Sequence, residues 1–157
     1  RLDMATSGVM VMALTKAAQR ELNRQFQQRL TAKRYIALVQ GQPQANIGSI
    51  ELPLICDWPN RPKQMVCFSR GKKALTHFEL LSTELTSSRV RLTPVTGRSH
   101  QLRVHMQWLG HPILGDKFYG TEQGKGSVPR LQLHACALQI RHPTSGTELY
   151  FEVDCPF

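Results

Sequence analysis

The sequence predicts a single α+β domain, built on a mostly antiparallel mixed sheet with a few flanking helices. Two observations lead to this class: short segments with the apolar pattern of strands dominate the chain, and only two segments have helical spacing. No regular alternation of strand and helix occurs, which argues against a parallel α/β fold. The length of 157 residues suits one domain, because single domains usually contain about 100 to 200 residues.

The chain is expected to begin with a strand, a helix and a second strand. Residues 8–14 form a continuous apolar run after turn residues, which is typical of a strand buried on both faces. Thr15 can cap a helix over residues 16–28, and residues 33–40 then return to strand spacing. The expected apolar face of the helix comprises Ala18, Leu22 and Phe26.

The rest of the chain is expected to hold several strands and one more helix. Residues 41–70 are rich in Pro, Asn and Gly and predict short strands joined by irregular loops. Residues 74–81 and 89–92 have the pattern of an antiparallel pair. Ser99 can cap a helix that ends at Gly110. Two final strands are expected at residues 132–140 and 148–153.

The charge points to a polyanionic partner. Twenty Lys and Arg against eleven Asp and Glu give a net charge of +9, and a positive field concentrates nucleic acid near the surface. The alternative is a basic protein whose charge only keeps it in solution. No apolar stretch is long enough to span a membrane and no secretory signal is present, so we expect a cytoplasmic protein.

Asp3 is the first candidate for chemistry. It lies in a polar turn just ahead of an apolar run, where a carboxylate can reach a ligand, although such an aspartate often only caps a turn. Arg98 and Arg103 lie in or beside the second predicted helix. If either arginine met Asp3, the ion pair would hold the carboxylate ionised and oriented. The spacing leaves open that both arginines lie on a solvated helix face.

Other candidates suit RNA better than metal. Tyr35 follows two cations and could stack on an unpaired base, although a strand tyrosine more often only packs. Arg61 and Lys63 add positive charge to the middle loops. His100 and His105 cannot share a zinc ion from one helix face, because five residues turn a helix about 140° beyond a full turn. We therefore expect no metal site.

Three segments carry long motifs: RLDMATSG at residues 1–8, KRYIA at 33–37 and GRSHQLRVH at 97–105. In this order they resemble the RluA family of RNA pseudouridine synthases, although the histidine that leads the first motif is absent. The loop over residues 52–64 is similar to that of the branch acting on both ribosomal and transfer RNA. The resemblance implies the pseudouridine synthase catalytic fold for residues 1–157, as a fragment lacking the N-terminal part.

The resemblance also implies a reaction, the isomerisation of uridine to pseudouridine at specific sites of structured RNA. Expected substrates are 23S ribosomal RNA and anticodon stem-loops of transfer RNA. Asp3 would be the catalytic aspartate, Arg103 its charge partner, and Tyr35 a wall of the uracil pocket and a candidate to take the C5 proton. Leu102 would pack against the ring. Arg1 would fill the space that the everted uridine leaves in its stack.

Further RNA contacts are expected from Arg98, His100, Arg61 and Lys63. Bond breaking and bond making balance within the substrate, so the resemblance implies neither a cofactor nor a metal. Nothing in the sequence demands a partner chain, and a monomer is expected. The competing hypothesis is a non-catalytic RNA-binding or RNA chaperone module that uses only the basic surface and the stacking tyrosine.

Overall fold

The computed structural model describes residues 2–157, and its central feature is a seven-stranded sheet. The strands of this sheet are β1 (Ser7–Gly8), β2 (Ala32–Gln40), β3 (Ile47–Glu51), β6 (Leu75–Thr83), β7 (Ser87–Pro94), β8 (Leu133–Arg141) and β9 (Glu148–Glu152). Their spatial order is β1-β8-β2-β7-β6-β3, and β9 also pairs with β8. Only β1 and β8 run parallel, while the other pairs are antiparallel. This confirms the predicted α+β class.

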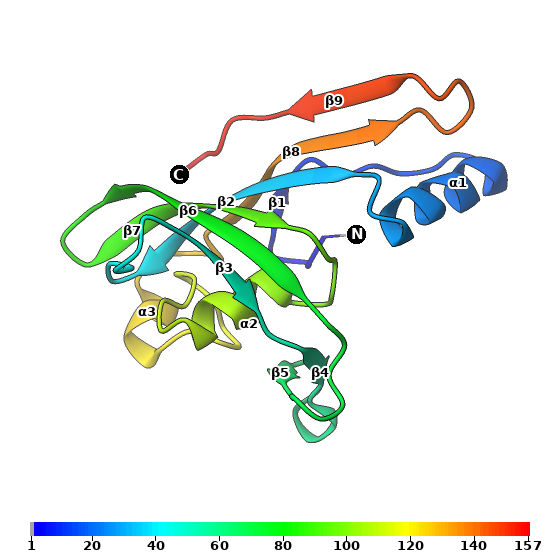
Figure 1. Cartoon of the computed structure of the whole chain (residues 1–157). Helices are drawn as coiled ribbons and strands as arrows, with labels where there is room; N and C mark the ends of the chain where they lie inside the picture. Colours follow the sequence, from blue (N-terminus) through cyan, green and yellow to red (C-terminus); the bar gives the residue numbers. More distant parts are fainter. Residues whose placement is uncertain (1) are drawn as a thin grey trace.

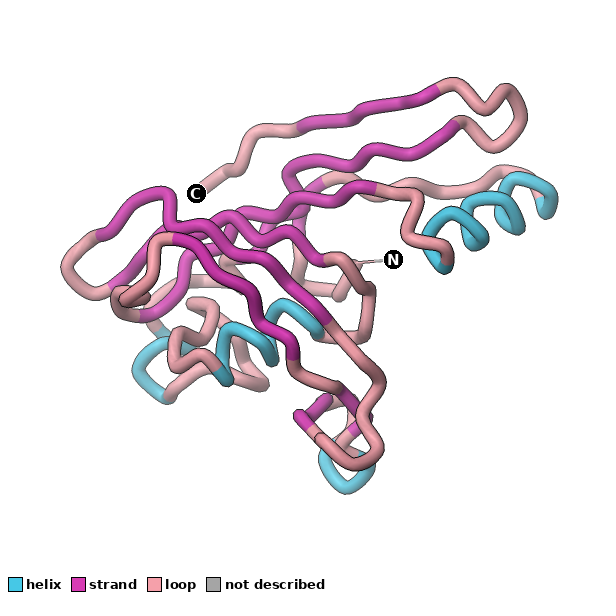
Figure 2. The backbone as a smooth tube through the Cα atoms, viewed as in Figure 1, coloured by secondary structure: helices cyan, strands magenta, loops and turns pink. Residues whose placement is uncertain are grey.

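Three helices and a small hairpin complete the described chain. The helices are α1 (Lys16–Gln27), α2 (Gln101–Trp108) and α3 (Glu122–Gly126), and β4 (Leu54–Cys56) pairs with β5 (Gln64–Val66) around a 3-10 turn at Trp58–Asn60. Figure 1 shows α2 and α3 close together beside the sheet, with the hairpin projecting away from it. Figure 2 shows α1 apart from them, near the far ends of β2 and β8. No helix within residues 2–157 is long and apolar enough to cross a membrane.

Helix α1 forms as its sequence predicts. The Thr15 hydroxyl accepts a hydrogen bond from the backbone amide of Ala18 at 3.1 Å and so caps the helix. The apolar stripe packs on β8, where Leu22 is buried with Leu138 and Ile140. The amide of Gln25, which is also fully buried, donates to the carbonyl oxygen of Arg141 and accepts from its backbone amide. Helix α1 is thereby fixed to the end of β8.

The main core lies between the sheet and α2. Alternate residues of the central strands β2 and β7 point into it, as expected for a sheet with one covered face. Helix α2 contributes Leu102 and Met106, and Tyr35 packs against the edge of the cluster. Tyr35, Ala37 and Val39 therefore share the core-facing side of β2.

The expected strand over residues 8–14 is wrong. Strand β1 ends at Gly8, and the following residues pair with no strand over most of their length. Val9 and Val11 pack on the α1–β8 cluster, but Met10 and Met12 are exposed. The continuous apolar run predicted a segment buried on both faces. Within the described residues, only the face with Val9 and Val11 is covered.

The second predicted helix exists, but Ser99 does not begin it. Helix α2 starts at Gln101, and the residue before it, His100, is left-handed with φ of 52°. Leu109 ends the helix ahead of Gly110, whose φ is 87°. The short helix α3 was not predicted, because five residues with two glycines carry no helical periodicity.

Candidate active site

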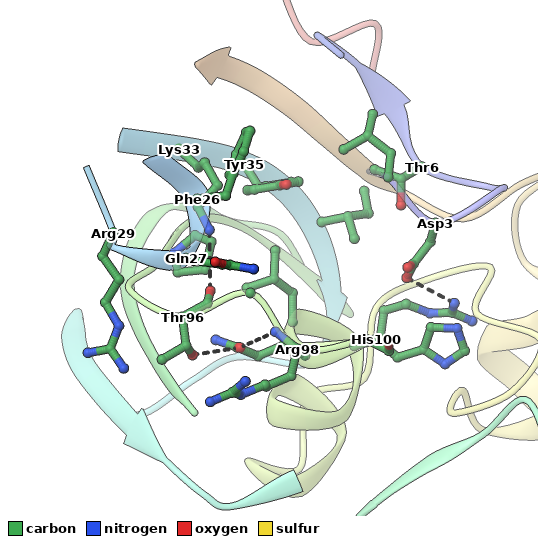
Figure 3. Close-up of a pocket in the computed structure, with 18 of the residues that line it drawn as sticks. Asp3, Thr6, Phe26, Gln27, Arg29, Lys33, Tyr35, Thr96, Arg98 and His100 are labelled. Atoms are coloured by element: carbon green, nitrogen blue, oxygen red, sulfur yellow. Dashed lines mark hydrogen bonds and ion pairs between the residues drawn. The ribbon is translucent and has the colours of Figure 1, made fainter. Parts of the chain in front are cut away.

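A cavity of about 510 Å³ opens where the N-terminal loop, α1, β2 and α2 meet. Figure 3 shows the carboxylate of Asp3 on one side of this cavity and Lys33, Arg29 and Arg98 on the other. Most of the residues expected from the sequence to act on RNA line it. They are Asp3, Tyr35, Arg98, His100, Leu102 and Arg103.

The structure decides which arginine meets Asp3. Arg103 Nη1 donates to Asp3 Oδ2 at 3.3 Å across 100 residues of sequence. The Arg103 side chain is 6% exposed and that of Asp3 is 25% exposed, so the guanidinium is shielded while the carboxylate still faces the cavity. Arg98 instead donates from Nε to the carbonyl oxygen of Lys73 and lies on the exposed rim.

Asp116 holds Arg103 in place, a role that was not predicted from the sequence. Its two carboxylate oxygens accept from Arg103 Nε and Nη2, both at 2.7 Å, and its side chain is 0% exposed. The backbone amides of Phe118 and Tyr119 also donate to this carboxylate. Burial alone would lower the pKa of Arg103, but hydrogen bonding to Asp116 and the charges of Asp116 and Asp3 raise it above its ordinary value. Arg103 is therefore a fixed cation between two carboxylates.

Gly8 anchors the loop that carries Asp3. Its φ is 117°, and a Cβ at this position would lie 2.2 Å from the carbonyl oxygen of Ala135. The short parallel pairing of β1 with β8 thus requires glycine. Between Asp3 and Gly8, the backbone amide of Thr6 donates to the carbonyl oxygen of Asp3 at 2.9 Å and closes the turn.

We expect Gly8→Ala to displace this loop, because both the backbone conformation and the space at position 8 exclude a side chain. The free energy of unfolding should fall by about 1 to 3 kcal/mol, and isomerase activity should fall more than stability alone explains. Urea unfolding and initial rates measured on the folded fraction check both effects. A Gly146→Ala variant is the control, because its φ is also positive but its Cβ would meet nothing within 4 Å.

Tyr35 and Leu102 form an apolar wall of the cavity. Lys33 and Tyr35 lie two apart on β2 and both face the cavity, while Arg34 faces the other side and pairs with Glu152. A bulge in the pairing of β2 with β8 lies between Arg34 and Tyr35, beside the site. Burial, and then the negative charge of Asp3, raise the pKa of Tyr35 to about 12. Its phenol is therefore protonated throughout the neutral range.

His100 connects the cavity to the β4–β5 hairpin. Tyr119 Oη accepts from the backbone amide of Gln64 at 2.8 Å and lies 2.6 Å from His100 Nδ1. The tyrosine hydroxyl donates to Nδ1 when the neutral imidazole has its proton on Nε2, and it accepts from Nδ1 in the other tautomer. Burial lowers the pKa of His100 below its ordinary value. The negative charge of Asp3 opposes this shift, and the positive charge of Arg103 adds to it. A left-handed histidine is unfavourable, and here it brings the ring to the cavity.

Two of the predicted RNA contacts lie elsewhere. Arg61 and Lys63 are in the β4–β5 hairpin and do not line the cavity, and Arg61 stacks over the Trp58 ring at 4.8 Å. Arg1 lies outside the described residues. His105, set aside as a metal ligand, is buried beside Thr76 and Leu52, with Nδ1 2.9 Å from Thr76 Oγ1.

Comparison with known proteins identifies the family of this chain. The family model described as RNA pseudouridylate synthase matches residues 1–108, which include Asp3, Tyr35 and Arg103. The chain belongs to the RNA pseudouridylate synthase family. It is 58% identical to the dual-specificity RNA pseudouridine synthase RluA of Yersinia pestis, over 100% of this chain and 77% of that protein. Identity to the protein of the same name from Escherichia coli (strain K12) is 56%, over 100% and 72% respectively.

Solved structures of this family share the fold. Human RNA Pseudouridylate Synthase Domain Containing 1 superposes with a TM-score of 0.87 at 34% identity, over 100% of this chain and 68% of that one. Human RNA Pseudouridylate Synthase Domain Containing 4 gives 0.80 at 30% identity, over 99% and 70%. The chain is thus an RNA pseudouridine synthase, an isomerase whose substrate is uridine in RNA.

Proposed function

We propose that Asp3 attacks the ribose of an everted uridine, with Arg103 as the cation that orients its carboxylate. The observation that carries this proposal is the 3.3 Å contact between Arg103 Nη1 and Asp3 Oδ2 inside the cavity. Because Asp116 holds the guanidinium from the other side, the position of Arg103 does not depend on Asp3. Asp3 is then free to move onto the substrate while the charge that stabilises it stays fixed.

The reaction rearranges one nucleotide and consumes nothing. The bond between N1 of uracil and C1′ of ribose breaks, the uracil turns, and a bond forms between its C5 and C1′ as the C5 proton leaves and N1 gains one. The carboxylate of Asp3 either forms an ester at C1′ or removes a ribose proton to give a glycal. Both routes start from ionised Asp3. Because atoms and charge balance within the nucleotide, the proposed reaction requires no cofactor.

Tyr35 and Leu102 are proposed to hold the uracil, and Tyr35 to relay the C5 proton. With a pKa of about 12, the Tyr35 phenol is protonated at neutral pH. The phenol can therefore take the C5 proton only while it gives up its own hydroxyl proton. The proposed acceptor of that proton is Asp3, whose negative charge contributes to the raised pKa of Tyr35. Leu102, which is 7% exposed, supplies a second apolar contact.

We expect Tyr35→Phe to lower kcat by about 10²- to 10³-fold with little change in KM, because the ring remains and only the proton path is lost. Tyr35→Leu, which also removes the ring, should raise KM in addition. Single-turnover rates and RNA binding by both variants check this split. Equal losses in kcat and affinity for Tyr35→Phe would contradict the relay.

The proposed targets are loop uridines of 23S ribosomal RNA and of transfer RNA anticodon stem-loops in the cytoplasm. The relatives named dual-specificity synthases and the net charge of +9 support structured RNA of more than one kind. The hairpin with Arg61 and Lys63 is proposed to contact the stem, since it projects away from the sheet (Figure 1) and is linked through Tyr119 to His100 at the cavity. We propose that residues 1–157 form one catalytic domain that acts as a monomer.

The test is release of tritium from RNA labelled at uracil C5, together with mapping of pseudouridine in cells with and without the gene. The proposed function predicts release that saturates at one label per target stem-loop, and loss of those positions from the map. An RNA chaperone with the same basic surface would bind the RNA and release no tritium. Unchanged maps of ribosomal and transfer RNA would refute the proposed targets.

A further inference from the structure

Three cations form an edge of the cavity opposite Asp3 and have no anionic partner among the residues that the structure describes. Arg29, Lys33 and Arg98 all line the cavity, and Figure 3 shows them across from Asp3. Within residues 2–157, no carboxylate forms an ion pair with any of the three. Arg103, in contrast, is paired with carboxylates on both sides. The cavity therefore has one end where two carboxylates outnumber one cation and another end with excess positive charge.

Lys33 is the least expected of these cations. It is half-buried, and burial lowers the pKa of its ammonium group. Its hydrogen-bond partner is the carbonyl oxygen of Thr96 at 3.3 Å, a neutral acceptor. A desolvated ammonium group is unfavourable unless an anion meets it, so its place in the cavity indicates an anionic ligand.

Arg29 is unfavourable for a different reason. It follows α1 in the left-handed conformation, with φ of 59°, at the position where helices favour glycine. The backbone there would gain from glycine, yet the residue is an arginine whose side chain lines the cavity. Two independent local costs, one electrostatic and one conformational, thus coincide on the same edge of the cavity.

We propose that Arg29, Lys33 and Arg98 form a subsite for a phosphodiester group of the RNA next to the everted uridine. This inference rests on the proposed function, because it takes the uridine to lie between Asp3 and Tyr35. The negative charge of Asp3 repels phosphate, so the backbone of the substrate is bound most favourably at the opposite, cationic end. Such contacts position the nucleotide and carry no base specificity.

The variants Arg29→Gly and Lys33→Met separate this role from a structural one. Each removes an unfavourable feature of the free protein, so thermal stability should stay constant or rise. Each should also weaken RNA binding about tenfold and lower the slope of log Kd against log salt by about 0.7 to 0.9. Lys33→Arg should retain most of the affinity. The control is Lys16→Gln, because Lys16 is exposed at the other end of the 12-residue α1.

The decisive measurement combines these variants with altered RNA. The probe is a stem-loop whose loop uridine the wild-type protein isomerises, with a neutral methylphosphonate placed on either side of that uridine. Asp3→Ala is present throughout, so that turnover does not disturb the equilibrium. At one of the two positions, the neutral linkage and Lys33→Met should each cost about tenfold in affinity, and together no more than either alone.

The subsite would be overturned if the affinity losses from Lys33→Met and from the neutral linkage multiplied at both linkage positions. A clear fall in the stability of Arg29→Gly would also overturn it. Loss of turnover without loss of affinity, measured on Arg29→Gly and Lys33→Met with Asp3 intact, would place these cations on the uracil ring and also overturn the subsite. Failure of the proposed function is seen separately, as undiminished tritium release by Asp3→Ala. The binding cycle reads only the contact between cations and backbone.

Discussion

Asp3→Ala is expected to abolish pseudouridine formation, with a fall of at least about 10⁴-fold in the single-turnover rate. The structural consequence should be small, because Arg103 keeps both of its 2.7 Å bonds to Asp116. The Asp3 contact is longer, at 3.3 Å, and its side chain is 25% exposed. RNA binding and the unfolding temperature should therefore stay close to those of the wild type.

Asp3→Asn is the matched control, because it retains the shape of the side chain and removes only the charge. It should be as inactive as Asp3→Ala, since an amide neither attacks ribose nor accepts its proton. The measurement is tritium release in single turnover, with RNA binding and thermal melting on the same samples. Release above about 1% of the wild-type rate by freshly prepared Asp3→Ala would remove Asp3 from the proposed role.

Asp116→Ala is expected to have the largest effect on stability. It leaves the Arg103 guanidinium, which is 6% exposed, without its bidentate partner and leaves two backbone amides without an acceptor. Breaking a buried ion pair from one side costs about 3 to 5 kcal/mol. In a domain of this size the unfolding temperature should fall by about 6 to 20 °C. Activity should also fall, because Arg103 is then free to leave Asp3.

The double variant Asp116→Ala/Arg103→Met distinguishes an ion pair from simple packing. Removing both charges should restore part of the stability lost in Asp116→Ala, because no isolated cation remains buried. Isomerisation should stay absent, since Asp3 then lacks its cation. Urea unfolding of the two single variants and the double variant gives the coupling. A double variant less stable than the sum of the single losses would contradict this account of Asp116.

The sequence predicted most of the elements because their periodicity is local. Thr15, the apolar stripe of α1 and the alternation along β2 are patterns within a few residues, and the structure confirms them. The strand predicted over residues 8–14 was wrong, because an apolar composition does not tell whether other residues cover the outer face of the segment. Ser99 failed as a cap because a left-handed residue, His100, occupies the start of α2.

The site was harder to predict than the fold because its contacts cross the whole chain. Spacing alone could not choose between Arg98 and Arg103 as the partner of Asp3, and only the resemblance favoured Arg103. Asp116 follows a glycine in an apolar segment, where an aspartate usually marks a turn. Its bidentate grip on Arg103 depends on the packing of α2 against the chain after it, which no short pattern encodes.

The hydrogen bonds that join Gln64, Tyr119 and His100 make the hairpin and the wall of the cavity parts of one connected unit. Lengthening or exchanging that hairpin would shift the Gln64 amide and, through the phenol, the ring at the pocket wall. Chimeras that borrow the hairpin of another synthase should therefore lose turnover on every RNA, including RNAs they still recognise. Restoring the turnover rate of such chimeras would require further substitutions around Tyr119. Substrate range in this enzyme should therefore change through joint substitutions in the hairpin and around Tyr119, and not through exchange of the hairpin alone.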